Sequence, residues 1–156
     1  MMKMEADIKT LILEIQEELT HLEGLKQELD TIAKERSLPM RRAQGSILHD
    51  FYNGCERIFR NIAEAVNGGF DPEEAWHRNL LYRMTLDLKD VRPRVISHEL
   101  AADLDEYLGF RHVFRNIYGF ELREDRLDRL ITQLDRTLPR FKAEISAFLH
   151  FLEQLT

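Results

Sequence analysis

The stretch EDRLDRLITQLDRTLPRFKAEISAFLHFLEQL, residues 124–155, decides the fold class. Its apolar residues recur at alternating steps of four and three, the spacing of one helix face: Leu127, Ile131, Leu134, Leu138, Phe141, Ile145, Phe148, Leu152 and Leu155. This spacing predicts a long helix whose apolar seam packs against other helices. Pro139 lies inside the stretch and predicts a kink or a break, because proline has no N–H to donate to the preceding turn.

Two more long helices are predicted in the first half of the chain. Residues 4–36 carry apolar side chains at three- and four-residue steps with Glu and Lys between them, and Ser37-Leu38-Pro39 is expected to end this helix. A second helix is expected over residues 41–66, with Asn67-Gly68-Gly69 as its stop signal.

The middle of the chain predicts two shorter helices. Asp71-Pro72-Glu73-Glu74 has the residue types of a helix start, and this third helix should reach Leu88. Pro93 predicts a connection, after which Ser97 starts a fourth helix that runs to Tyr118. We therefore expect an all-α, up-down bundle of about five helices, formed by a single domain over residues 1–156.

Composition narrows the classes of function. The net charge of −6 argues against a protein that coats nucleic acid non-specifically, although it leaves room for a local basic cleft. The only cysteine, Cys55, lies on an apolar stripe and is expected to be a buried, inert thiol, so no disulfide framework is expected. The histidines lack metal-ligand spacing, and no apolar run has membrane-spanning length. We expect a cytoplasmic protein with neither a metal nor another cofactor.

The segment RHVFRNIY, residues 111–118, breaks the pattern of the fourth helix. At about 100° per residue, the apolar arc of that helix continues downstream into Arg111, Arg115 and Tyr118, with His112 and Asn116 beside it. Because a buried arginine needs partners for its charge, the seam is expected to open here into a cleft or a subunit interface. Two guanidinium groups in such a cleft would suit a phosphate-bearing ligand.

A structural interpretation of the same residues is also open. Arg111 and Arg115 could form ordinary interhelix ion pairs with Asp103, Asp105 or Glu121, with Tyr118 as a capping aromatic.

Trp76 and His77 are adjacent on the third predicted helix. They are interpreted as a core aromatic and a surface polar residue, respectively.

The stretches FRHVFRNIYGFEL (residues 110–122), EEAWHRNLL (73–81) and RPRVISHEL (92–100) together resemble the HepT-like group of HEPN-domain proteins. In HepT-like members the motif reads Arg, four residues, His, one residue, Tyr. Arg111 matches the Arg and Tyr118 matches the Tyr, whereas Asn116 stands at the His position.

The resemblance implies a HEPN-like bundle and a metal-independent ribonuclease toxin. Such a toxin is a homodimer in which two motifs face one cleft that binds RNA, and a minimal nucleotidyltransferase antitoxin adenylylates the motif tyrosine. By this carry-over Arg111 binds the scissile phosphate and Tyr118 is the residue that is modified. Arg115, the second guanidinium of the same helical arc, is expected to be a further phosphate-binding residue.

Asn116 is the departure from the motif. A histidine can take a proton from a ribose 2′-hydroxyl near neutral pH, but a carboxamide has no basic nitrogen. Both a natural loss of the catalytic base and an engineered exchange of histidine that inactivates the protein would place asparagine at position 116. His112, one turn earlier, is a candidate substitute base. The alternative function is a non-catalytic HEPN protein that binds a nucleotide or a nucleotidyltransferase partner.

Overall fold

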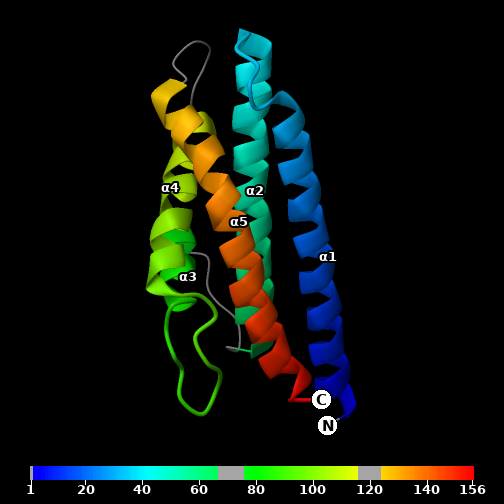
Figure 1. Cartoon of the computed structure of the whole chain (residues 1–156). Helices are drawn as coiled ribbons and strands as arrows, with labels where there is room; N and C mark the ends of the chain where they lie inside the picture. Colours follow the sequence, from blue (N-terminus) through cyan, green and yellow to red (C-terminus); the bar gives the residue numbers. More distant parts are fainter. Residues whose placement is uncertain (1, 67–75, 116–123) are drawn as a thin grey trace.

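The computed structural model describes residues 2–66, 76–115 and 124–156. Over these residues the chain forms the predicted all-α bundle, with an isolated bridge between Leu88 and Arg92 as its only β-type pairing. The described helices are α1 (Met2–Ile32), α2 (Leu38–Val66), α3 (Trp76–Arg83), α4 (His98–Arg115) and α5 (Glu124–Glu153). Long helices alternate in direction, and the start of α1 and the end of α5 lie at the same end of the bundle (Figure 1).

Helix α2 is the centre of the bundle, because it contacts each of the other four described helices. Its aromatic residues join it to its neighbours: Phe51 meets Tyr107 of α4 edge to face with ring centroids 5.2 Å apart, and Phe59 meets Phe141 of α5 at 5.9 Å. The α5 seam is buried as predicted, except that Ile131 is only partly buried and Leu155 is exposed. The apolar faces of α2, α4 and α5 therefore pack into one core.

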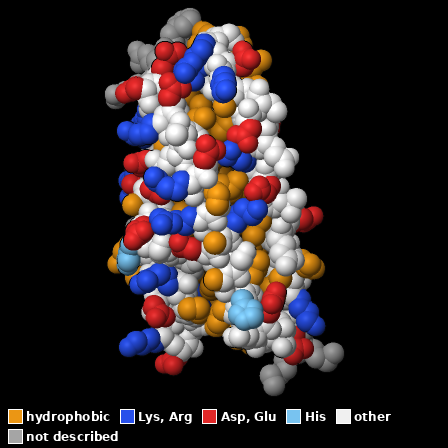
Figure 2. Space-filling model, in the orientation of Figure 1, with side chains coloured by type: hydrophobic (Ala, Val, Ile, Leu, Met, Phe, Trp, Pro, Cys, Tyr) orange, Lys and Arg blue, Asp and Glu red, His pale blue; other side chains and the backbone are white. Residues whose placement is uncertain are grey.

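Charged side chains of both signs are intermixed over the face of the bundle that Figure 2 shows. Apolar side chains appear between them in the same view. No helix among the described residues combines the length and apolar character needed to cross a membrane.

The junction between α1 and α2 differs from the prediction. Helix α1 ends at Ile32 instead of residue 36, because the side chain of Gln44 donates hydrogen bonds to the carbonyls of Ile32 (2.6 Å) and Glu35 (3.1 Å). Helix α2 begins at Leu38 instead of residue 41, so Pro39 lies in its first turn. Proline is tolerated there because the N–H that it lacks would have no partner within the helix.

Helix α3 ends at Arg83, so the predicted extension to Leu88 is wrong. The buried guanidinium of Arg92 donates to the carbonyls of Arg83, Leu86 and Pro93, each at 3.0 Å. Because Arg92 supplies hydrogen-bond donors to these carbonyls, no further helical turn is needed to supply them. The chain instead turns at Asp90, whose φ is 68°. The start predicted at residues 71–74 lies outside the described residues.

Two further expectations concern single residues. Helix α5 continues through Pro139, so the predicted break does not occur. The apolar seam residues on both sides of Pro139 stay buried, and their burial stabilises the helix by more than the loss of one backbone hydrogen bond costs. Cys55 is buried as predicted, and burial raises the pKa of its thiol.

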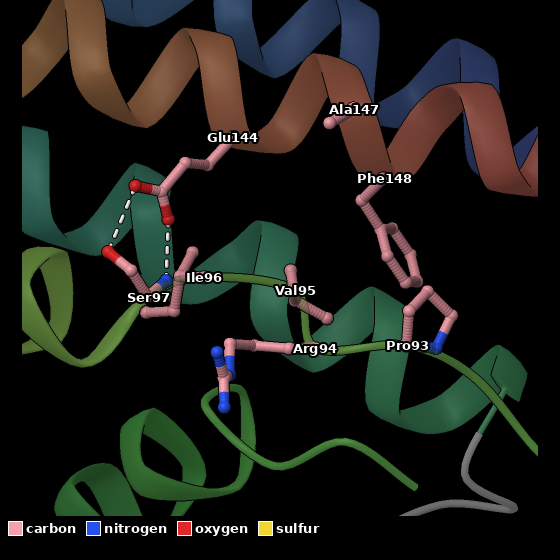
Figure 3. A pocket seen from close by; sticks show the side chains of 8 residues that line it. All are labelled: Pro93, Arg94, Val95, Ile96, Ser97, Glu144, Ala147 and Phe148. Carbon is pink, nitrogen blue, oxygen red and sulfur yellow. Dashed lines mark hydrogen bonds between the residues drawn. The ribbon is translucent and has the colours of Figure 1, made fainter. Parts of the chain in front are cut away.

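The start of α4 is fixed by a side chain of α5. Ser97 precedes the first helical residue, and its Oγ accepts a hydrogen bond from the Leu100 N–H at 3.1 Å, as expected of the predicted helix start. The carboxylate of Glu144 accepts from both the backbone N–H and the Oγ–H of Ser97 (Figure 3). A negative charge at a helix N-terminus is favourable, so Glu144 both caps α4 and ties it to α5.

Glu144→Ala is expected to lower the free energy of unfolding by about 1–2 kcal/mol, because both donors of Ser97 lose their charged acceptor. Urea unfolding followed by circular dichroism measures the change. Glu153→Ala, on an exposed position of the same helix, is the control and should change stability by less than about 0.5 kcal/mol. Equal stability of the two variants would contradict this role.

Candidate active site

Arg111 lies on the face of α4 that packs against α2, and it is only 6% exposed. Its two terminal nitrogens donate to the two carboxylate oxygens of Glu56 at 3.1 and 3.3 Å, and one of them also donates to the Asn53 side-chain oxygen at 2.8 Å. The guanidinium lies 5.0 Å from the ring centroid of Tyr52. Arg111 therefore sits in a charge-assisted network built by Tyr52, Asn53 and Glu56, which lie within about one turn of α2.

Within one chain this network closes the seam at Arg111, where the sequence predicted an opening into a cleft or a subunit interface. The guanidinium is enclosed by α2 and paired, so the interhelix ion pair is the right description, but the acid is different. Asp103 and Asp105 pair with arginines of α5 and α3 instead, and Glu121 lies outside the described residues. Sequence reasoning missed Glu56 because it lies on another helix, although its place beside the apolar stripe of α2 was a usable signal.

His77 belongs to the same network, so its interpretation as a surface polar residue was wrong. Its Nδ1 lies 2.8 Å from an oxygen of Glu56 and 2.9 Å from a terminal nitrogen of Arg111. The ring of Trp76 lies against the imidazole, with centroids 3.7 Å apart and a tilt of 32°. Trp76 itself is partly buried against the core, close to its expected role. Three helices thus contribute to one polar cluster.

A pocket of about 260 Å³ adjoins this cluster between α3 and α4, lined by His77, Arg78, Leu108, Gly109 and His112. His112 is exposed, and His77 and Arg78 face the same space from α3. Two imidazoles and a guanidinium therefore line one small cavity.

A second cation approaches this pocket from α5. A Cβ atom on Gly109 would lie 3.0 Å from a terminal nitrogen of Arg126, so the missing side chain makes room for that guanidinium. Carboxylates already pair with two of the lining residues: Arg78 donates from Nε to Asp105 at 3.0 Å, and His77 lies 2.8 Å from Glu56. The pocket margin thus gathers groups that can donate hydrogen bonds to an anion.

The remaining motif residues are not all within the described part. Helix α4 extends to Arg115, but the side chain of Arg115 and the whole of Asn116 and Tyr118 lie outside the described residues. Their predicted roles remain predictions. In the parts of the chain that are described, no group of three or more His, Cys, Asp or Glu side chains could hold a metal ion.

The pocket at the opposite end of α4 offers less chemistry. It measures about 320 Å³ and lies between residues 93–97 and α5, lined in part by Val95, Ala147 and Phe148 (Figure 3). Its carboxylate, Glu144, is already used to cap α4. The cluster around Arg111 and its adjoining pocket are the stronger candidate site, because together they combine a fork of donors, a carboxylate and two imidazoles.

Glu56→Ala is expected to lower the free energy of unfolding by about 3–5 kcal/mol, because it leaves Arg111 charged and buried without its counterion. The control, Asp105→Ala, breaks an exposed ion pair between α3 and α4 and should cost less than about 1 kcal/mol. Urea unfolding measures both. A Glu56→Ala variant no less stable than Asp105→Ala would show that the buried pair does not hold α2 to α4.

Residues 43–152 match the family model described as HepT-like protein. The matched region covers most of α2, all of α3 and α4 and nearly all of α5, and it includes the whole segment 111–118, whereas α1 lies outside it. Searches of curated proteins and of solved structures returned no match. Because the family model spans well over half of the chain, this protein belongs to the HepT-like family.

Proposed function

We propose that this chain is the toxin of a toxin–antitoxin pair and that it cleaves RNA without a metal ion at the cleft of a homodimer. The observation that carries the proposal is the HepT-like match, since it contains both the segment 111–118 and the helices that surround Arg111. In this proposal residues 1–156 act as one helical domain, in the cytoplasm.

Arg111 is the residue that orients the scissile phosphate. A guanidinium has five N–H donors; in Arg111 three of them are directed at Glu56 and Asn53, and a terminal nitrogen also lies 2.9 Å from Nδ1 of His77. Those bonds hold the fork in one orientation at the end of α4, and a fixed fork loses less freedom when it binds a phosphate than a mobile side chain does. Arg115, one turn later, adds a second cation for the RNA backbone.

Regulation falls to Tyr118 and a minimal nucleotidyltransferase antitoxin. Transfer of AMP to the phenol oxygen would add bulk and negative charge at the position that an RNA phosphate must approach. Repulsion between the two phosphates would then keep RNA away from Arg111 and Arg115.

The first test is RNA cleavage by the purified protein in the presence of a metal chelator. Wild-type protein should cleave, and Arg111→Lys should lose at least about 100-fold in rate, because lysine keeps the charge but not the fork. Arg57→Lys, on the exposed side of α2, is the control and should match wild type. Intact RNA after incubation with concentrated wild-type protein would end the proposal.

The modification is tested by intact mass after co-expression with a candidate nucleotidyltransferase. We expect the mass of at least one AMP group on the wild-type chain and no addition on Tyr118→Phe, which keeps the ring but has no hydroxyl. AMP found on the variant as well would show that another residue is modified.

A non-catalytic HEPN protein that binds a nucleotide or a nucleotidyltransferase is the second candidate. Two observations favour it: Asn116 stands where the motif has histidine, and Arg111 is almost fully enclosed by its own chain. An inert wild type together with ribonuclease activity in Asn116→His would select this candidate over the toxin.

A further inference from the structure

We propose that His77, oriented by Glu56, is the general base of this chain. It takes the role of the motif histidine, which Asn116 cannot fill because a carboxamide has no basic nitrogen. This inference rests on the RNA cleavage proposed above. It assigns the base to α3, outside the motif at the end of α4.

The position of the ring proton follows from the contacts of His77 Nδ1. An ionised carboxylate can only accept hydrogen bonds, so the 2.8 Å contact with Glu56 is favourable only when Nδ1 carries the proton. A terminal nitrogen of Arg111, which can only donate, lies 2.9 Å from the same Nδ1 and competes with Glu56 for it, but that nitrogen also donates to Glu56 at 3.3 Å. We assign the Nδ1 proton to the carboxylate contact, which leaves the lone pair of a neutral His77 on Nε2.

Nε2 is the nitrogen available to a substrate. Among the described residues no hydrogen-bonding partner contacts it, and the His77 side chain is 32% exposed where it lines the pocket shared with His112. A base must reach the proton that it removes. His77 meets this condition, because its ring both contacts Arg111 and lines the pocket.

Two contacts hold the imidazole in place. Glu56 fixes Nδ1 and is itself fixed by two bonds from Arg111, while Trp76 packs against the ring. Glu56 also stabilises the imidazolium that forms when Nε2 takes a proton, which compensates for the nearby charge of Arg111. The resulting pair of Glu56 and His77 has the arrangement of a carboxylate-oriented base.

The step is a transesterification within the RNA. Nε2 of His77 takes the proton of the ribose 2′-hydroxyl, and the 2′-oxygen forms a bond to phosphorus. The bond from phosphorus to the 5′-oxygen of the next nucleotide breaks, and that oxygen takes a proton from solvent water. The products are a 2′,3′-cyclic phosphate and a free 5′-hydroxyl, and His77 returns its proton to solvent, so no oxidant or metal is required.

His77→Gln is the direct test, because glutamine can still accept and donate hydrogen bonds but cannot act as a base near neutral pH. We expect the rate of cleavage with cyclic-phosphate products to fall by about 100-fold or more, with RNA affinity changed little. His150→Gln, an exposed histidine near the end of α5, is the matched control and should retain wild-type activity.

Chemical rescue separates loss of the base from loss of structure. Adding imidazole to His77→Ala should restore part of the activity, whereas it should not restore Arg111→Lys. An active wild type with His77→Gln within about threefold of it would overturn the inference alone, since a general base contributes far more than that. Loss of activity without any imidazole rescue would also overturn it, and an inert wild type would overturn the proposed function together with this base.

Discussion

The buried ion pair between Arg111 and Glu56 is the interaction on which the site depends. Both residues are 6% exposed, and removing two charges from water costs several kcal/mol per ion, so the pair is stable only because its geometry is bidentate. That geometry fixes the register of α4 against α2 at one level of the bundle. Glu144 fixes the other end of α4 through Ser97, so the helix is held at both ends by carboxylates.

The same pair explains how one polar cluster can serve both structure and chemistry. Glu56 has two oxygens, one of which is shared between Arg111 and His77. The carboxylate thereby orients a cation suited to phosphate and an imidazole suited to proton transfer. In the proposed reaction these are the two groups that RNA cleavage requires, and an asparagine at position 116 is compatible with it because the base comes from α3.

The fold could be predicted from the sequence to within a few residues, because helix periodicity and seams are local signals. The errors lie where distant side chains decide: Gln44 ends α1 early, and Arg92 replaces the last turn predicted for α3. The arc that turns cationic at Arg111 pointed to the residue around which the polar cluster is built, but the roles predicted for its site stay predictions. The partners of Arg111 were missed, because Glu56 and His77 lie 55 and 34 residues away in the chain on other helices.

The protonation of His77 tests the central claim most directly, since it reports the carboxylate contact that defines the cluster. Nitrogen-15 chemical shifts of the imidazole distinguish a protonated Nδ1 from a protonated Nε2. We expect the neutral ring of the wild type to carry its proton on Nδ1, and Glu56→Ala to lose this preference because its acceptor is gone. A wild-type ring with the proton on Nε2 would contradict the account, since Glu56 would then not orient His77 as a base.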